Sequence, residues 1–297
     1  MIAAIMVSIL AVGQTASVSE QGQKGTDSIQ NVIVKPDFNK GLLELGLDSV
    51  SLANGDRFLV EVSFDGRQVA FGEFGSGQPM TVDMPSDFHR WTPDHPFLYD
   101  LKIIVLRDDE VVGEHERSFA MRCFGNWREE NSLNRFALNG LPIFLFGTLW
   151  TAPIGDSLHN EAIASDLQRI KDLGFNMVRV RDEIDLSVWL PLCDRMGLVL
   201  WHEGFDEVAN RLQDVPTVEI QLPMDGLAAE EATDNYVGYA NRLYQETYQG
   251  FSAAVIGQLA DTGTNANGLL SFDRSKSKVD EKRLFFINRK ISHALAE

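Results

Sequence analysis

The sequence has few basic residues for its length. It carries 26 Lys and Arg against 43 Asp and Glu in 297 residues, which gives a formal net charge of −17 at pH 7. A surface with this excess of negative charge repels phosphate backbones and anionic lipid head groups. The composition therefore argues against nucleic acids and membranes as partners, and it favours an uncharged ligand such as a sugar, or a protein.

Cysteine is also scarce. Cys123 and Cys193 lie far apart in the sequence and show none of the spacings of a metal site. We expect both to be buried thiols, with a disulfide as the less favoured alternative. No Ser-His-Asp order and no glycine-rich phosphate loop is found, and His202 with Glu203 is too small a set to hold a metal ion. We therefore expect no cofactor and no metal.

Long apolar runs are absent after the amino terminus. No later run approaches the roughly 20 apolar residues of a membrane span, so we expect a soluble mature protein. Residues 2–12 have the length of a secretory h-region, and Ala11-Val12-Gly13 resembles a cleavage site, but no basic residue precedes them. Residues 1–28 are therefore either a signal peptide or a strand left from an upstream domain. An extracellular or periplasmic location is slightly favoured over a cytoplasmic one.

Residues 29–122 show the pattern of an antiparallel β-sandwich. Short alternating segments are separated by turn residues, and about six or seven of them fit into about 90 residues without a helical period. Asp65-Gly66 lies between two such segments and gives a strong hairpin signal. We therefore expect an immunoglobulin-like sandwich here.

After residue 142 the pattern changes to alternating strands and helices. The predicted strands are residues 144–146, 177–180, 198–201 and 253–258. The predicted helices are residues 163–173, 186–196 and 227–248, with a last helix capped by Asp280. Strands that alternate with helices in this way predict parallel βαβ units.

The second region is short for a complete barrel. Residues 206–223 carry little periodicity and predict no element, so residues 142–297 hold about four βα units, whereas a closed eight-stranded barrel needs about 200 residues. The expected fold class is therefore an immunoglobulin-like β-sandwich followed by a partial (β/α) TIM-type barrel. Residues 123–141 connect the two.

Several segments, in this order, resemble glycoside hydrolase family 2, the group of β-galactosidases, β-glucuronidases and β-mannosidases. In the sandwich they are the Trp-Thr-Pro to Leu-Tyr segment at residues 91–99 and the Phe-Ala-Met-Arg segment at 119–122. In the barrel region they are residues 138–147, 166–180, 193–201, 258–261 and 267–274. Each is weak alone, but as an ordered set they are specific.

The resemblance implies retaining hydrolysis of a β-glycoside by two carboxylates about 5 to 5.5 Å apart. In the family, the acid/base glutamate ends the fourth barrel strand and the nucleophile glutamate ends the seventh. Neither strand is identified in this sequence, and the family's sugar-binding jelly-roll domain is not found either. The resemblance therefore implies a truncated relative whose catalysis is impaired or lost.

The candidate site lies at the carboxyl ends of the predicted barrel strands, where barrel chemistry is placed. Glu203 and Asp261 are the nearest carboxylates for catalysis, although Glu203 is also consistent with a solvated loop residue. Arg179 matches an arginine that orients the nucleophile in relatives, and a structural ion pair with Asp182 or Glu203 is an equal alternative. The candidates for contact with substrate are Arg179, Asp182, Trp201, His202, Asn265 and Trp150. For the two tryptophans, burial in the core is the alternative.

Two functions follow. The first is a family 2-like protein of carbohydrate metabolism that acts on a neutral β-glycoside, with doubtful catalysis. The second is a non-catalytic module that binds carbohydrate or protein, and a deletion product without function of its own also remains open. Because a partial barrel has two unpaired strand edges, a homodimer formed through these edges is the hypothesis for assembly.

Overall fold

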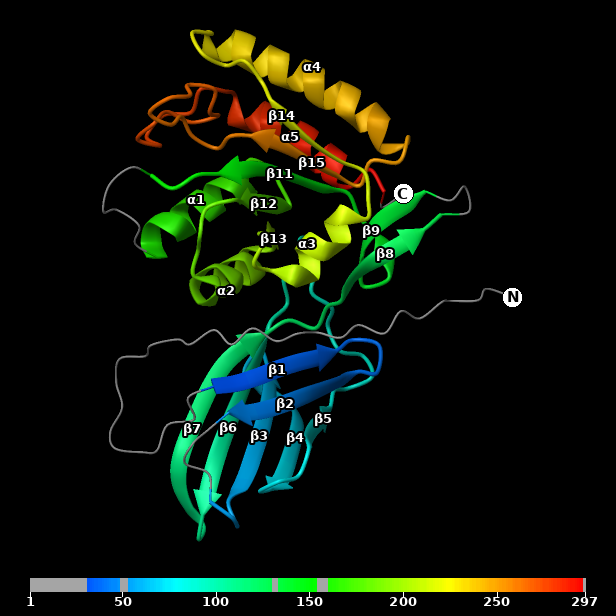
Figure 1. Cartoon of the computed structure of the whole chain (residues 1–297), viewed down its shortest axis with the longest axis vertical. Coiled ribbons are helices and arrows are strands. Elements are labelled where there is room, and N and C mark those ends of the chain that lie inside the picture. Colours follow the sequence, from blue (N-terminus) through cyan, green and yellow to red (C-terminus); the bar gives the residue numbers. More distant parts are fainter. Residues whose placement is uncertain (1–30, 49–52, 130–132, 154–159, 296–297) are drawn as a thin grey trace. The chain divides into compact units, whose positions relative to one another are not determined.

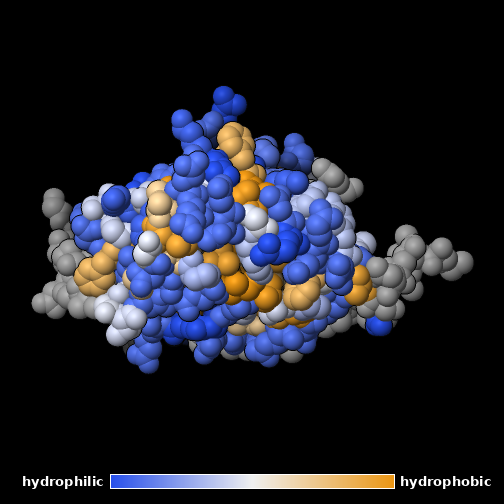
Figure 2. All heavy atoms as spheres, turned by 90° about the horizontal axis from the view of Figure 1, so that it is seen from above, coloured by the Kyte–Doolittle hydropathy of each residue, from blue (hydrophilic) through white to orange (hydrophobic). Residues whose placement is uncertain are grey.

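The computed structural model describes residues 31–48, 53–129, 133–153 and 160–295. The chain divides into two compact units, Met1–Phe88 with Tyr99–Phe119, and His89–Leu98 with Ala120–Glu297. The amino-terminal stretch for which a signal peptide is predicted lies outside the described residues. Within them, no helix is long and apolar enough to cross a membrane. The face shown in Figure 2 is largely hydrophilic, with hydrophobic residues in a short stripe near its middle.

The first unit consists of two antiparallel sheets (Figure 1), with strand orders β1-β2-β5 and β4-β3-β6-β7. The strands are β1 (Asn31–Asp37), β2 (Leu42–Asp48), β3 (Arg57–Phe64), β4 (Arg67–Gly75), β5 (Met80–Asp83), β6 (Tyr99–Arg107) and β7 (Glu110–Phe119). Alternate side chains of the central strands are buried, among them Phe58, Val60 and Val62 of β3. This alternation is typical of a sandwich whose sheets each bury one face.

The hairpin predicted at Asp65-Gly66 is confirmed. These residues join β3 to β4, and both have positive φ angles, 50° and 70°. A two-residue turn with positive φ at both positions matches the right-handed twist of the flanking strands. The turn therefore sets the pairing next to it, Phe64 with Arg67 and Ser63 with Gln68, and a bulge between Val62 and Ser63 shifts the register of the rest of the hairpin.

The second unit contains a five-stranded sheet with the order β13-β12-β11-β15-β14, and every adjacent pair is parallel. Its strands are β11 (Leu145–Trp150), β12 (Met177–Val180), β13 (Val199–Trp201), β14 (Thr217–Gln221) and β15 (Ala253–Gly257). The helices are α1 (Asn160–Asp172), α2 (Leu186–Met196), α3 (Asp206–Gln213), α4 (Ala229–Thr247) and α5 (Glu281–Ser292). A smaller sheet contains β8 (Phe124–Arg128), β9 (Asn134–Leu138) and β10 (Leu141–Pro142). The predicted fold class, a β-sandwich followed by a parallel α/β region, is confirmed.

Several elements were missed by the sequence analysis, among them β8 and β9 in residues 123–141, which were expected only to connect the two regions. Residues 206–223 were expected to form no element, but they contain α3 and β14. Both are short, with 8 and 5 residues, and β14 is not fully buried on either face, so neither produces a long periodic pattern. The parallel sheet therefore has five strands where four were predicted, because β14 precedes β15 and pairs with it.

The parallel sheet has two apolar sides, since successive side chains of a strand point to opposite faces. One side, the outer face, carries Phe146, Val178 and Ile256 and packs in one core with residues of α1, α2, α4 and α5. The other side, the inner face, carries Met177 and Val255 among others. It packs in a second core with residues of β8, β9 and α3.

The direction of the connections explains why α3 covers the inner face. From β11 through α1 to β12, and through α2 to β13, each step moves the same way across the sheet, whereas α3 leads back from β13 to β14 at the opposite edge. Crossovers between parallel strands are right-handed in about 98% of cases, so a reversed step places its helix on the opposite face. Val208 and Leu212 of α3 are accordingly buried in the inner core.

Candidate functional site

Arg179 is the centre of the polar contacts at the carboxyl edge of the sheet. It lies near the end of β12 and is only 6% exposed. Its guanidinium lies 4.4 Å from the ring centroid of Trp201, Nη2 donates to Oε1 of Glu203 at 3.2 Å, and Nη1 donates to the backbone oxygen of Trp201 at 3.3 Å. The structure therefore brings together three of the predicted site residues.

Glu219 is a fourth participant, which the sequence analysis missed. It lies on β14, and its Oε1 is 3.6 Å from Nε of Arg179, while its other carboxylate oxygen pairs with Arg181. The alternation of Thr217, Val218, Glu219 and Ile220 was the signal that could have identified this strand. Arg179, Arg181, Glu203 and Glu219 are called the charge cluster below.

The charge cluster shows that the sheet is curved. β12 and β14 are separated by β11 and β15, and since neighbouring strands lie about 4.8 Å apart, these two would be about 14 Å apart in a flat sheet. Nε of Arg179, on β12, lies 3.6 Å from Oε1 of Glu219, on β14. Since side chains of strands stand roughly perpendicular to the sheet, this contact requires the strands to curve around the inner face. The sheet therefore retains the curvature of a barrel segment.

Asp182 and His202 join the loops next to this cluster. His202 Nε2 lies 3.0 Å from the backbone oxygen of Asp182, and His202 Nδ1 accepts a hydrogen bond from the backbone N–H of Gly204 at 2.9 Å. These partners assign the imidazole proton to Nε2. Asp182 Oδ2 accepts from the backbone N–H of Ala152 at 3.2 Å, so these contacts connect the loops that follow β11, β12 and β13.

Trp150 lies on the other side of the sheet. It is 1% exposed and belongs to the outer core, where Nε1 donates to Oδ2 of Asp166 at 2.7 Å. Trp150 follows Leu149, which packs against the inner core. The alternation of β11 thus directs the tryptophan away from the charge cluster.

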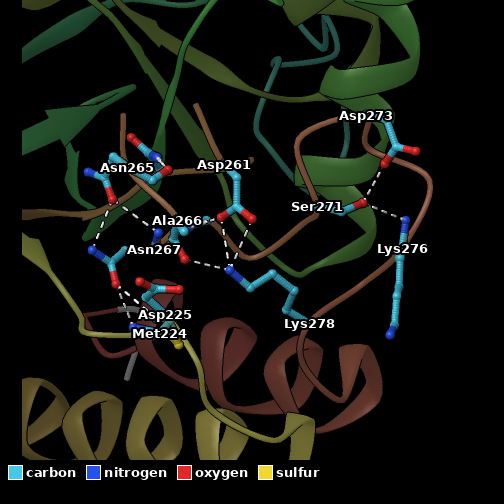
Figure 3. Close-up of polar contacts among 12 residues, drawn as sticks. Met224, Asp225, Asp261, Asn265, Ala266, Asn267, Ser271, Asp273, Lys276 and Lys278 are labelled. Carbon is cyan, nitrogen blue, oxygen red and sulfur yellow. Dashed lines mark hydrogen bonds and ion pairs between the residues drawn. The ribbon is translucent and has the colours of Figure 1, made fainter. Parts of the chain in front are cut away.

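Asp261 and Asn265 lie in the loop that follows the last strand (Figure 3). Asp261 Oδ1 accepts from Nζ of Lys278 at 2.9 Å and from the backbone N–H of Gly268 at 2.8 Å. Asn265 Oδ1 accepts from the backbone N–H of Asn267 at 3.0 Å. In the described part of the chain, no hydrogen bond or ion pair joins Asp261 or Asn265 to the charge cluster, and their contacts organise the loop itself.

The strand before the last ends in an amide side chain. Gln221 is the final residue of β14, and its Cα pairs in register with that of Gly257, the final residue of β15. Gln221 is exposed, and it lies two positions after Glu219, so both side chains point to the same face of the strand.

Neither cysteine lies in a metal site. Cys123 is half-buried and Cys193 is buried, and no disulfide joins them. Burial raises the pKa of the Cys193 thiol, which makes this side chain unreactive. Among the residues that the structure describes, no group of three or more His, Cys, Asp or Glu side chains is arranged to hold a metal ion.

The sequence model of glycosyl hydrolases family 2 matches residues 27–122. A putative β-glucuronidase of Formosa agariphila is 31% identical over 116 residues, which cover 38% of this chain and 14% of that protein. Residues 27–122 thus form a glycoside hydrolase family 2 domain. The β-galactosidase BoGH2A of Bacteroides ovatus is 29% identical over 153 residues, which cover 50% of the chain and 17% of the relative. The matched segments thus span less than a fifth of either relative.

Solved structures are similar to this chain over most of its length. A β-glucuronidase of Ruminococcus gnavus superposes with a TM-score of 0.67 at 13% sequence identity, covering 89% of the chain and 68% of that protein. The FMN-binding β-glucuronidase of Facaelibacterium prausnitzii L2-6 gives a TM-score of 0.63 at 13% identity, and the match covers 90% of this chain and 61% of that protein. At these identities the likeness establishes only the fold that the chain shares with these proteins.

Proposed function

We propose that this chain binds the end of a β-glycoside at the carboxyl edge of its parallel sheet without hydrolysing it. The observation that carries the proposal is Gln221, which ends β14, the strand before the last. In the closed barrel of the family, the corresponding strand is the seventh and ends in the nucleophile glutamate. An amide cannot supply the carboxylate that attacks the anomeric carbon in a retaining mechanism.

The two glutamates of the charge cluster support binding rather than catalysis. Glu203 and Glu219 are both ion-pair partners of Arg179, and Glu219 also pairs with Arg181. In this arrangement the carboxylates hold the edge of the sheet together. A separate acid and nucleophile with different roles, which a retaining mechanism requires, is not formed by these contacts.

The remaining features of the edge suit a carbohydrate. Ligands bind at the carboxyl ends of parallel strands because the loops there converge. Trp201 is part-buried at this edge and offers an aromatic ring, while Glu203 and Gln221 offer exposed hydrogen-bonding groups. An aromatic ring beside polar groups suits the apolar face and hydroxyl groups of a sugar.

The test combines hydrolysis with binding. The purified chain is incubated with a panel of aryl β-glycosides beside Gln221→Ala, and saturation-transfer NMR measures binding of the matching methyl glycosides. We expect the wild type to show no turnover above that of Gln221→Ala. We also expect it to bind at least one glycoside with a dissociation constant of about 1 mM. Turnover by the wild type that disappears in Glu203→Gln or Glu219→Gln, with cooperative unfolding retained, would overturn the proposal, as would the absence of any binding.

Assembly is a second expectation. The homodimer hypothesis requires the edges β13 and β14 to pair with a second copy, but α3 already packs against the inner face that such a closed barrel would enclose. A monomer is favoured, because closure by a second copy would have to displace the buried residues Val208 and Leu212. We expect light scattering to give the mass of one chain across a hundredfold range of concentration, and a mass of two chains would support the dimer instead.

A further inference from the structure

The connections of the parallel sheet reverse between two adjacent strands. The chain leaves β12 towards α2, which packs on the outer face, and it leaves β13 towards α3, which packs on the inner face. In open α/β sheets, ligands bind at the carboxyl ends of the strands where the connections diverge in this way. A closed barrel has no such point, because all of its helices lie outside the strands.

The residues at this reversal are Arg179, Trp201 and Glu203, with His202 bound to the backbone of Asp182 across the two loops. Below them, the inner face is filled by the core that includes Met177, Val199 and residues of α3. A ligand at this position is therefore held at the edge of the sheet, above a packed interior, and only a terminal ring fits this description.

We propose that the β12–β13 edge takes an uncharged terminal sugar ring and discriminates against a uronate. This inference rests on the proposed function, and it names the class of glycoside that the site selects. The relatives include a protein named β-galactosidase and one named putative β-glucuronidase, so the two classes are the relevant alternatives.

The charges at the edge determine the choice. The charge cluster has two guanidinium groups and two carboxylates, and each arginine already has a glutamate partner. A uronate carboxylate would have to displace Glu203 or Glu219 from its arginine, and the displaced glutamate would remain nearby as a like charge. The net charge of −17 further opposes an anionic ligand.

A neutral ring meets no such opposition. The side chain of Glu203 is 80% exposed, so its oxygens are free to accept hydrogen bonds from sugar hydroxyl groups while one remains with Arg179. The guanidinium of Arg179 lies over the ring of Trp201 and holds the indole in place, so a sugar ring would stack on the part of the indole that stays exposed. An ordered aromatic ring and an ordered carboxylate are the two elements that a pyranose needs for stacking and hydrogen bonding.

The experiment uses ¹⁹F NMR of the full chain labelled with 5-fluorotryptophan. There are five tryptophans; Trp91, Trp150 and Trp189 are buried, and Trp127 is 44% exposed and serves as the matched control. Methyl β-galactopyranoside and methyl β-glucuronide are titrated separately, and the signals are assigned with Trp201→Phe and Trp127→Phe. We expect galactoside to shift the Trp201 signal and leave that of Trp127 unchanged, and glucuronide to bind about tenfold more weakly or worse.

Two variants test the charge argument. Glu219→Gln leaves Arg181 without its carboxylate partner. We therefore expect this variant to reduce the ratio of the dissociation constants for glucuronide and galactoside by about tenfold. Glu203→Gln removes an anionic acceptor and should weaken galactoside binding. If Glu219→Gln fails to fold, the ratio of the two affinities in the wild type decides alone.

The outcomes separate the two proposals. Equal or tighter binding of glucuronide by the wild type overturns the inference and leaves glycoside binding intact. A shift of Trp127 without Trp201 overturns the location of the site. If neither of these sugars nor any other glycoside of the panel binds, the proposed function itself fails.

Discussion

Replacing Asp166 with alanine is expected to lower the free energy of unfolding of the second unit by about 3–5 kcal/mol. Asp166 lies on α1 and is 6% exposed. Its Oδ2 accepts from Nε1 of Trp150 at 2.7 Å and from Nε of Arg274 at 2.8 Å. The variant leaves a part-buried guanidinium without its counter-ion and a buried indole N–H without an acceptor, and both groups lose solvation without compensation.

Urea unfolding followed by tryptophan fluorescence measures this loss. All five tryptophans lie in residues 89–98 and 120–297, so the signal reports on the second unit alone and avoids averaging over two units. Asp172→Ala is the matched control, because Asp172 is an exposed acid on the same helix whose Oδ1 accepts from Gln168. Asp172→Ala should change the free energy of unfolding by less than about 0.5 kcal/mol. A loss below about 1 kcal/mol for Asp166→Ala would contradict the expectation.

Replacing Arg135 with alanine is expected to have a similar effect, about 3–5 kcal/mol. Arg135 lies on β9 and is 2% exposed. Its Nη1 donates to the backbone oxygens of Thr247 and Phe251, each at 2.7 Å, and its Nε donates to Oε1 of Glu129 at 2.7 Å. One side chain therefore connects the small sheet to the carboxyl end of α4 and to the segment before β15, where a cation also stabilises the helix terminus.

The same fluorescence measurement tests this variant. Arg128→Ala is the control, because Arg128 is an exposed arginine of neighbouring β8. This substitution should change the free energy of unfolding by less than about 0.5 kcal/mol. Arg135→Lys keeps the charge but loses the planar set of donors, so we expect it to recover only part of the stability. Full stability of Arg135→Lys would mean that charge alone matters at this position.

Much of the fold follows from local sequence. The Asp65-Gly66 turn, the alternation of β3 and the N-cap of α5 by Asp280, whose side chain accepts from the backbone N–H groups of Lys282 and Arg283, are all confirmed. Each depends on a few neighbouring residues, and the energy that decides it is available within a single turn or strand. These features were predictable for that reason.

The position of α3 was not predictable in this way. Its eight residues give little periodicity, and the helix lies on the inner face only because β14 joins the sheet at the edge opposite to β13. That placement depends on the order of all five strands. The right-handed crossover rule then determines the face, but the rule requires the strand order first.

Some residues of the candidate site could likewise be predicted from local sequence, and others depend on the order of the strands. Arg179, Trp201 and Glu203 could be grouped from sequence, because the carboxyl ends of adjacent parallel strands meet at one edge. Glu219 could not, since its contact with Arg179 crosses two intervening strands and exists only in a curved sheet. Trp150 shows the converse: its place at a strand end was predictable, but the face to which it points was decided by the register of β11.

The sequence by itself determined the resemblance to glycoside hydrolase family 2, the order of β-sandwich and α/β region, and the strand ends that carry the polar residues. These depend on local periodicity and on turn and cap residues, whose energies act over a few positions. Only the tertiary structure decided that the strands form a curved open sheet covered by α3, and that two arginines share two glutamates across it. Those features depend on strand order and curvature, because contacts between distant residues have no local pattern in the sequence.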